Sequence, residues 1–543
     1  MTGPSDFGRR ALAAGRSAGR IGATMVRSGL LHPGPPIRTA RQLNALRRWG
    51  TLMGGTVVST AARDPDRTAV VDDEGELTYA ELDERTDRLA VALGGLGSPS
   101  RIAVLCRNHR GMVQSLVACS KLGADLVMLN TGMSTAQLLD VVRGQDIEVV
   151  IADPEFGEFL DALPEGVRTV TALGPDSDME RLIDTTSGAG VRPPERAGRT
   201  IVLSSGTTGT PKGARRHSRP GMKPLFSILS RIPFRVCERT VIEAPLFHTW
   251  GYAMLQAAIP MRSTVILRRR FDPEQTLRTV AESKATVLIA VPVMLQRILE
   301  LPEEVRRRYD TSTLRITASS GSALPGALAT AYMDAFGDHL YNLYGSTEAS
   351  WVSIATPADL RACPDTAGTP PPGTRLAILD EQGRPLPPGT PGRIFVANEL
   401  MFEGYTGGQS KEMRDGLMSL GDVGEVDEQG RLFVRGRDDD MIVSGGENVF
   451  PSAVEEVLAV LPEVREVAVV GAPDPEFGQR LVAYVVRHPG ADLDADAVRA
   501  HVRSKLARFS VPRDVHFVDE LPRNATGKIV RARLAPAAQE DPA

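Results

Sequence analysis

Residues Val202–Arg216 read VLSSGTTGTPKGARR, directly after the β-branched run that begins at Thr200. Gly206, Gly209 and Gly213 let backbone amides approach an anion closely. The Ser and Thr hydroxyls add donors, and Lys212 adds a point charge. The stretch therefore predicts a strand that leads into a phosphate-binding loop.

The spacing of this loop excludes the best-known nucleotide motifs. A GxxxxGK[ST] loop counted from Gly206 would place glycine at position 211, where this chain has Pro211. Gly213 follows the lysine, so the hydroxyl that would bind Mg²⁺ is missing as well. A GxGxxG pattern is also absent from the loop. The spacing therefore argues against a P-loop GTPase or ATPase.

The composition points to a multidomain cytosolic protein. A chain of 543 residues is too long for one core, and a net charge of −4 without a long basic patch in the body of the chain argues against a nucleic-acid binder. The four cysteines lack metal-ligand or CxxC spacing, so we expect reduced, buried thiols. No apolar run reaches the ~18 residues that span a membrane. We expect a cytoplasmic location.

Strands and helices alternate from about residue 65 onward. Short apolar or β-branched runs predict strands, and helical segments separate most of them; the runs lie at 101–106, 124–129, 147–153, 285–292 and 339–345. This order is typical of an α/β fold with layered, mostly parallel sheets. Pro and Gly become frequent after about residue 370, which predicts a small β subdomain. A compact α+β unit follows from about residue 440.

The first 50 residues carry nine Arg against one acid, Asp6. If residues 8–30 form a helix, Arg9, Arg16, Arg20 and Arg27 share a narrow arc. One interpretation is a basic amphipathic helix on the inner face of an anionic membrane. The alternatives are an organellar transit peptide, a helix packed on its own domain and an unstructured tail.

Several blocks of the chain resemble the motifs of the acyl-activating (adenylate-forming) enzymes, most closely the fatty-acid acyl-CoA synthetases. SSGTTGTPKG resembles their phosphate loop. Five further blocks occur in the family's order: PLFHTWG at 245–251, SSGSALP at 319–325, YNLYGSTEAS at 341–350, SLGDVGEVDEQGRLFVRGRDDDMIVSGGENVFPSAVEEVL at 419–458 and PRNATGKIVRARL at 522–534. The similarity covers roughly residues 60–535. It implies an N-terminal extension (1–60), a large domain with the ATP and acyl pockets (61–438) and a small mobile C-terminal domain (439–543).

The resemblance also implies roles for individual residues. Lys528 matches the catalytic lysine, Thr347 the α-phosphate ligand, and Asp439 the hinge. His248, Trp250 and Gly251 match the acyl-pocket block, with His248 orienting the carboxylate and Trp250 as a gate. Glu348 and Thr207 match the Mg²⁺ positions. The positions implied to bind ATP or coenzyme A are Ser205, Gly206, Thr207, Thr208, Gly209, Lys212, Gly321, Ser322, Ala323, Tyr344, Gly345, Asp422, Arg437, Gly445, Gly446 and Glu447. Leu420 departs from the pattern, because most relatives have Thr or Ser there.

The implied activity is ATP- and Mg²⁺-dependent formation of an acyl-AMP, followed by transfer of the acyl group to coenzyme A. The apolar residues around the PLFHTWG block favour a medium- or long-chain fatty acid. The alternatives are a fatty acyl-AMP ligase, an aryl or other acid–CoA ligase, a peptide-synthetase-like module, a light-emitting oxygenase and a non-catalytic acyl- or nucleotide-binding protein. The sequence leaves the oligomeric state open.

Overall fold

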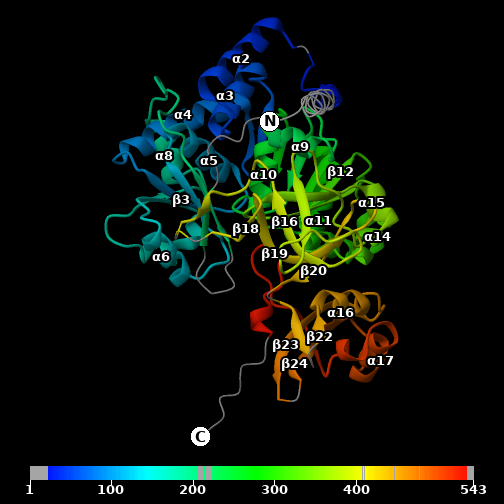
Figure 1. Ribbon diagram of the computed structural model, residues 1–543. Helices are drawn as coiled ribbons and strands as arrows, with labels where there is room; N and C mark the ends of the chain where they lie inside the picture. Colours follow the sequence, from blue (N-terminus) through cyan, green and yellow to red (C-terminus); the bar gives the residue numbers. More distant parts are fainter. Residues whose placement is uncertain are drawn as a thin grey trace, which may run out of the picture.

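The computed structural model describes residues 22–32, 34–204, 212–215, 223–406, 408, 410–438, 440–444, 447–475 and 477–534. One large sheet, which contains the strand labelled β12 in Figure 1, has the order β14-β13-β12-β11-β9-β10-β1-β2 and is parallel except at its two edge pairs. Its strands are β1 (Thr68–Asp72), β2 (Gly75–Thr78), β9 (Arg239–Ile242), β10 (Thr264–Leu267), β11 (Val287–Ala290), β12 (Ile316–Ser319), β13 (Leu340–Ser346) and β14 (Ser350–Ala355).

A second sheet has the order β17-β8-β7-β4-β3-β5-β6 and is parallel from β7 to β6. Its strands are β3 (Arg101–Leu105), β4 (Asp125–Met128), β5 (Val149–Ala152), β6 (Arg168–Thr171), β7 (Thr200–Ser204), β8 (Lys212–Arg215) and β17 (Gly404–Tyr405). The prediction of an α/β fold with parallel sheets is confirmed.

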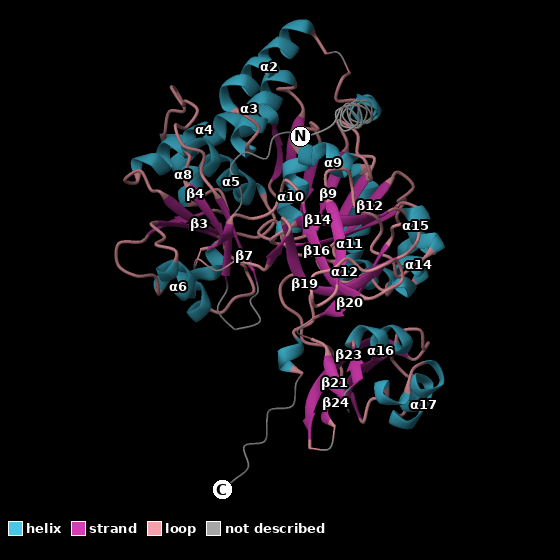
Figure 2. Ribbon diagram, in the orientation of Figure 1, coloured by secondary structure: helices cyan, strands magenta, loops and turns pink. Residues whose placement is uncertain are grey.

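Helices cover both faces of the two large sheets (Figure 2). They are α3 (Met53–Arg63), α4 (Tyr79–Gly95), α5 (Arg110–Leu122), α6 (Thr135–Gly144), α7 (Gly157–Asp161), α8 (Asp178–Thr185), α9 (Lys223–Leu229), α10 (Thr249–Ala258), α11 (Pro273–Ser283), α12 (Pro292–Leu299), α13 (Glu303–Arg307), α14 (Gly326–Phe336) and α15 (Pro357–Ala362). The side chains of α5 and α10 share one hydrophobic cluster with β3 and β11, so these helices lie between the sheets. Alternate strand residues point to the opposite faces, which α6 and α7 cover on one sheet and α11, α12 and α14 on the other.

Two smaller sheets complete the chain. The first is antiparallel and contains β15 (Arg375–Leu379), β16 (Gly392–Ala397), β18 (Met413–Arg414), β19 (Leu417–Val426) and β20 (Leu432–Arg437). The second lies in the C-terminal unit, orange and red in Figure 1, and has its own core. Its elements are β21 (Ile442–Ser444), β22 (Glu447–Val449), α16 (Pro451–Leu458), β23 (Val464–Asp474), β24 (Gly478–Arg487), α17 (Ala495–Lys505) and β25 (Asp514–Phe517). The domain boundary at 438/439 stays a prediction, because Asp439 lies outside the described residues.

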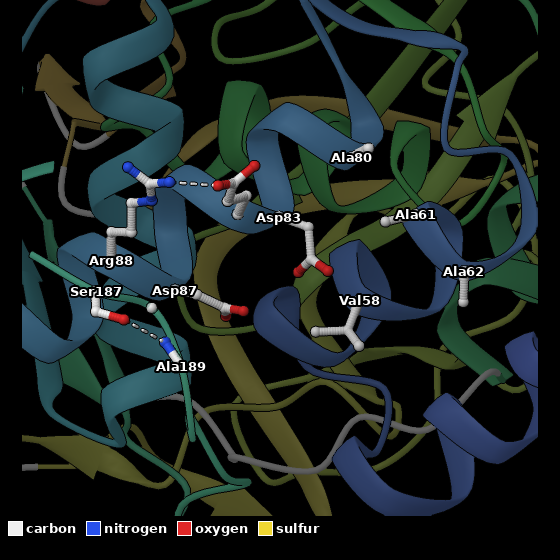
Figure 3. A pocket seen from close by; sticks show the side chains of 11 residues that line it. Val58, Ala61, Ala62, Ala80, Asp83, Asp87, Arg88, Ser187 and Ala189 are labelled. Carbon is white, nitrogen blue, oxygen red and sulfur yellow. Dashed lines mark hydrogen bonds and ion pairs between the residues drawn. The ribbon is translucent and has the colours of Figure 1, made fainter. Parts of the chain in front are cut away.

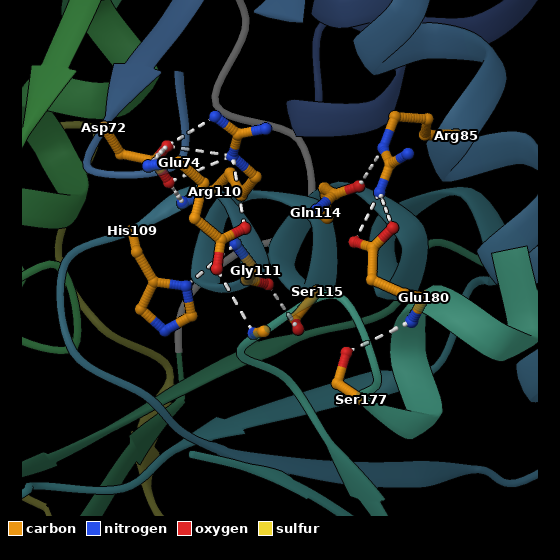
Figure 4. A network of polar contacts seen from close by, with 11 residues as sticks. Asp72, Glu74, Arg85, His109, Arg110, Gly111, Gln114, Ser115, Ser177 and Glu180 are labelled. Carbon is orange, nitrogen blue, oxygen red and sulfur yellow. Dashed lines mark hydrogen bonds and ion pairs between the residues drawn. The ribbon is translucent and has the colours of Figure 1, made fainter. Parts of the chain in front are cut away.

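A polar network fixes the helices beside the second sheet (Figure 4). Arg110, at the start of α5, makes a bidentate contact with Asp72 at the end of β1. Arg85 on α4 donates to Gln114 on α5 and to Glu180 on α8, at 2.8 and 2.6 Å. Both guanidinium groups are largely buried, and their carboxylate partners keep the charges compensated. The network therefore holds α4, α5 and α8 together as one layer.

The N-terminal segment is docked on the large domain. Residues 22–28 are helical and α2 spans Pro36–Trp49, whereas most of the helix predicted over 8–30 lies outside the described residues. The buried Arg63 donates to the carbonyl of His32 and to the side chains of Thr39 and Gln42. The face of the segment that contacts Arg63 is therefore packed on the large domain, as one of the predicted alternatives has it. The helix α2 was not predicted, because Pro35 and Pro36 resemble a loop.

Two cysteines correct an expectation. Cys106 and Cys119 are buried as predicted, but Cys237 and Cys363 are only half-buried, and all four are free thiols. Among the described residues, no helix is long and apolar enough to cross a membrane.

Candidate functional site

Three residues far apart in the sequence meet where β13 faces β19 and β20. The hydroxyl of Tyr344, on β13, donates to the carboxylate of Asp422, on β19. Asp422 and Arg437 are register partners across β19 and β20, and Arg437 Nη1 lies 3.6 Å from Asp422 Oδ1. The prediction that these three residues share one site agrees with this geometry. Their roles toward adenine and ribose stay predictions.

The surroundings of Tyr344, Asp422 and Arg437 shift the pKa values of the tyrosine and the aspartate. Burial raises the pKa of the Asp422 carboxyl, opposed by the Tyr344 hydrogen bond and the positive charges of Arg437 and Lys528. Burial, and then the charge of Asp422, raises the pKa of Tyr344 well above its usual value. Tyr344 therefore stays an O–H donor at neutral pH. A buried carboxylate held between a phenol and a guanidinium is suited to accept hydrogen bonds from a sugar diol.

A tight hairpin holds Glu348 beside the trio. A Cβ on Gly345 would lie 1.8 Å from the carbonyl oxygen of Ser350, so only glycine fits at the bulge between β13 and β14. Ser346 Oγ accepts from the backbone N–H groups of Glu348 and Ala349, at 3.2 and 3.1 Å. The turn thus fixes both Glu348 and its half-buried neighbour Thr347.

Tyr405 is a site residue that the sequence did not reveal. Its hydroxyl donates to Glu348 Oε1 at 2.5 Å, and Phe402 N donates to the Glu348 carbonyl at 2.7 Å. Burial and the hydrogen bond to Glu348 raise the pKa of Tyr405, so it remains a donor. A tyrosine within the Gly-rich stretch 403–408 was the only available signal, and it is a weak one.

The base of the predicted phosphate loop lies next to this pair. Residues 205–211, with the predicted ligands Ser205, Gly206, Thr207, Thr208 and Gly209, lie outside the described residues. The strands on either side are described: β7 and β8 pair in antiparallel register, with Ser204 opposite Lys212. Gly213 on β8 contacts Thr406, whose N–H donates to the Gly213 carbonyl at 2.8 Å. The strand that leaves the loop is therefore bonded to the residue after Tyr405, the partner of Glu348.

The block SSGSALP follows the carboxyl end of β12, between β11 and β13. Gly321 has a φ of +99°, which other residues rarely adopt, and a Cβ there would lie 3.4 Å from Val291. Ser322 is half-buried and Ala323 is exposed. Carboxyl ends of neighbouring parallel strands are the usual ligand crevice of α/β sheets. The predicted adenine wall is thus on the same edge as Tyr344.

The PLFHTWG block forms the start of α10. His248 is the N-cap residue, and its Nδ1 accepts from the N–H of Trp250 at 3.5 Å. Trp250 is 4% exposed and its indole N–H donates to the carbonyl of Ala290 at 2.9 Å. A Cβ on Gly251 would lie 2.3 Å from the Pro245 carbonyl, which explains the glycine. The gate role of Trp250 stays a prediction.

Asn108, which the sequence did not reveal either, holds this block in place. Its side-chain oxygen accepts from Leu246 N at 2.8 Å, and its Nδ2 donates to the carbonyls of Ala244 and Ile242 at 3.0 and 3.2 Å. The residue is buried, so these contacts satisfy its amide. They fix the backbone that leads to His248.

The C-terminal unit presents Lys528 on a turn that faces the large domain. Asn524 Oδ1 accepts from the N–H groups of Thr526 and Lys528, both at 3.0 Å. A Cβ on Gly527, next to the lysine, would lie 3.5 Å from Val291, and a Cβ on Gly321 would lie 3.4 Å from the same side chain, so the turn lies beside the SSGSALP block. Glu447 is exposed on β22. Asp439, Gly445 and Gly446 lie outside the described residues.

Two other features do not belong to this site. A cavity of about 560 Å³, between α3, α4 and residues 187–189, is lined by none of the predicted site residues (Figure 3). Cys106, His109 and Asp153 have metal-like spacing, but His109 Nε2 pairs with Asp153 at 2.7 Å and its Nδ1 accepts from Gly111 N. Both ring nitrogens are used, so this buried cluster is structural.

Comparisons with known proteins agree with the site. The family model described as AMP-binding enzyme matches residues 57–406, and that of the AMP-binding enzyme C-terminal domain matches 453–528. A feruloyl-CoA synthase from an Amycolatopsis species is 34% identical, over 89% of this chain and 98% of its own length. An indoleacetate–CoA ligase from Aromatoleum aromaticum is 31% identical, over 86% and 94%.

Among solved structures, ATP-bound MatB from Rhodopseudomonas palustris is similar with a TM-score of 0.80. It is 28% identical, and the match covers 89% of this chain and 98% of that one. A family model that matches more than half of the chain and a fold shared over 89% of it lead to the same conclusion. This chain belongs to the AMP-binding, adenylate-forming enzymes.

Proposed function

We propose that this protein is an AMP-forming acid–CoA ligase. It activates a carboxylic acid with ATP as acyl-AMP and then transfers the acyl group to coenzyme A. The observation that carries the proposal is the position of Lys528: the turn of the C-terminal unit that bears it lies against Val291 and Val293 of the large domain, beside Gly321 of the SSGSALP block. The site thus contains groups for a nucleotide on one unit and a cation on the other.

The chemistry requires positioning and charge neutralisation. A carboxylate oxygen attacks the α-phosphorus of ATP, the bond to pyrophosphate breaks, and acyl-AMP forms. The thiol of coenzyme A then attacks the acyl carbon and AMP leaves. The first step brings two anions together, so a lysine between the carboxylate and the α-phosphate lowers its barrier. Lys528 supplies that charge, and the Asp422–Tyr344–Arg437 trio holds the nucleoside.

The residues around Glu348 fit a magnesium ion. Mg²⁺ prefers hard oxygen ligands, and the hairpin turn offers the Glu348 carboxylate with the Thr347 hydroxyl beside it. Tyr405 orients the carboxylate through Oε1, as outer partners of metal ligands commonly do. When bound with ATP, the ion neutralises phosphate charge.

A medium- or long-chain fatty acid is the first substrate class, because the α10 block is apolar and Trp250 belongs to the hydrophobic core. A specific observation favours a second class. The feruloyl-CoA synthase and the indoleacetate–CoA ligase, both at least 31% identical, are named for aromatic acids. An aryl or arylalkanoic acid is therefore the alternative, and both classes share an apolar tail.

Pyrophosphate release across a panel of fatty, aromatic and amino acids, with and without coenzyme A, tests the proposal. A CoA-dependent thioester product from an apolar acid supports it, and the preferred acid identifies the class. Pyrophosphate release without any thioester indicates an acyl-AMP ligase. Nucleotide binding without turnover on any acid would indicate a binding protein and refute the proposal.

We also propose that residues 1–50 contact an anionic membrane surface. Residues 22–50 contain five Arg and no acid. Four large apolar side chains there are more than half exposed, namely Val26, Leu31, Ile37 and Leu43. Because Arg63 fixes one face of this segment to the large domain, the other face presents these groups outward. Charge and apolar surface together match an acidic lipid headgroup layer.

Sedimentation with phosphatidylglycerol-containing vesicles tests this surface. The double variant Ile37→Asp, Leu43→Asp should weaken vesicle binding by at least about tenfold, since each lost insertion is worth roughly 1.5–3 kcal/mol. The matched control is Val460→Asp, which alters an apolar side chain of similar exposure (61%) on the C-terminal unit. Equal binding to neutral vesicles, or an equal loss in the control, would refute the proposal.

A further inference from the structure

An ion pair joins the C-terminal unit to helix α12 of the large domain. Arg465, at the start of β23, donates through Nε and Nη2 to the two carboxylate oxygens of Glu300, at 2.9 and 2.8 Å. Glu300 is the C-cap residue of α12. One turn earlier, Gln296 Nε2 donates to the Arg465 carbonyl at 3.1 Å. The side chain and the backbone carbonyl of Arg465 are therefore both bound by helix α12.

A second set of contacts links this anchor to the turn that carries Lys528. Glu466, the next residue, accepts from Arg523 Nη2 at 2.8 Å. Arg523 Nη1 also donates to the carbonyl of Gly527 at 2.7 Å, directly before the lysine. Arg523 and Ile529 form a β-bridge that closes the turn. The position of Lys528 is thus tied to that of Arg465 through the half-buried guanidinium of Arg523.

The amino end of α12 touches the same turn. A Cβ on Gly527 would lie 2.5 Å from Val293 Cγ1, so the backbone of the turn rests directly on the helix. In the turn after β4 of the second sheet, a Cβ on Gly132 would lie 2.6 Å from the Cβ of Ala525. Helix α12 therefore contacts the C-terminal unit at both of its ends.

We propose that Arg465, with Glu300 and Gln296, forms a latch that holds the C-terminal unit in the orientation where Lys528 faces Asp422. These are positioning residues, since they act through the Arg523 turn. The inference rests on the proposed function for its consequence: the latched orientation serves acyl-AMP formation, and the latch must open for the thiol to enter.

The latch biases a ratio of two rates. We take the rate of each half-reaction to be proportional to the population of the C-terminal-unit orientation that serves it. The ratio of the adenylation rate to the thioester-formation rate then follows the equilibrium between the two orientations. Partly exposed pairs are worth little individually, but this one is bidentate and supported by Gln296. Removing its charge should lower the ratio about two- to fivefold.

Single-turnover rates measure that ratio. In Glu300→Gln and Arg465→Gln, adenylation from acid and ATP should slow relative to thioester formation from preformed acyl-AMP. The double variant Glu300→Arg, Arg465→Glu should restore part of the ratio. The matched control is Arg480→Gln, because Arg480 makes a similar 2.7 Å pair with Asp514 within the C-terminal unit. An unchanged ratio, or equal slowing of both steps, would overturn the latch.

A readout without turnover separates this idea from the proposed activity. The double variant Gly132→Cys, Ala525→Cys places two thiols where only a small shift permits a disulfide. Single-cysteine variants control for the four native thiols. Adding Arg465→Gln should slow crosslinking about two- to fivefold, matching the kinetic ratio. Undiminished crosslinking refutes the latch even if the enzyme is active; slowed crosslinking supports it even if no acid is turned over.

Discussion

Glu243 is a buried carboxyl whose replacement should make the protein more stable at alkaline pH. It follows β9, and it is 4% exposed. Thr276 Oγ1 donates to its Oε1 at 2.9 Å, whereas Oε2 has no hydrogen-bond partner within the described residues. Burial, partly offset by Thr276, raises its pKa from 4.5 to about 7. The neutral acid is therefore the form that the fold accommodates.

The sign and size of the effect follow from this pKa. Because folding raises the pKa of Glu243, its proton contributes fully to the free energy of unfolding below pH 4.5. This contribution is lost as pH rises through about 7. A difference of roughly 2.5 pKa units corresponds to about 3 kcal/mol at pH 8. For a cooperative unit of roughly 400 residues, that is about 3–4 °C in Tm. Glu243→Gln keeps the shape without the titration.

Thermal unfolding of the wild type and Glu243→Gln at pH 5 and pH 8 tests this. The Tm values should nearly agree at pH 5, and the variant should exceed the wild type by several degrees at pH 8. Glu180→Gln is the control: it removes a carboxylate that binds Arg85, so it should lower Tm at both pH values. An equal Tm difference for Glu243→Gln at both pH values would show that water reaches this carboxyl.

Three further changes probe the site. Lys528→Ala should slow acyl-AMP formation by two to three orders of magnitude and spare thioester formation from preformed acyl-AMP; equal loss in both steps contradicts its role. Tyr405→Phe should raise the Mg²⁺ concentration for half-maximal adenylation by about tenfold or more, measured by titration, because Glu348 loses its orienting donor; an unchanged titration argues against a metal at Glu348. Asp422→Asn should raise the KM for ATP by at least about tenfold, through loss of a charged acceptor, with less effect on the KM for the acid; equal effects on both would place it elsewhere.

Much of the fold could be predicted because it depends on local patterns. The runs at 101–106, 124–129, 147–153, 285–292 and 339–345 correspond to β3, β4, β5, β11 and β13, with bounds shifted by one or two residues. Continuous apolar runs are typical of strands buried on both faces, and both large sheets are covered on both faces. Helix α2 was missed because its proline-rich start resembles a loop, although proline is common in a first helical turn.

The residues of the candidate site also include some that could be predicted from the sequence and some that could not. Blocks such as YNLYGSTEAS and the region of Asp422 have a recognisable order, and the structure brings Tyr344, Asp422 and Arg437 together. Tyr405, Asn108 and Arg465 could not be predicted. Their partners lie 57, 138 and 165 residues away in the sequence, and no local pattern encodes a contact at such separations. These contacts depend on how the sheets and the C-terminal unit pack in the tertiary fold.

The contacts within each unit and those between the units explain how residues of both can form one site without a rigid connection. On the large domain, Tyr405 links the base of the phosphate loop to Glu348, so groups for phosphate and for metal move together. On the C-terminal unit, Arg523 links Lys528 to the residue beside Arg465. Each unit is therefore stiff within itself. Among the described residues, the contacts between them near the lysine include a bidentate ion pair, one amide hydrogen bond and van der Waals contacts at two glycines. An interface of this kind can open at low cost, and that is what a catalyst with two successive steps at one site requires.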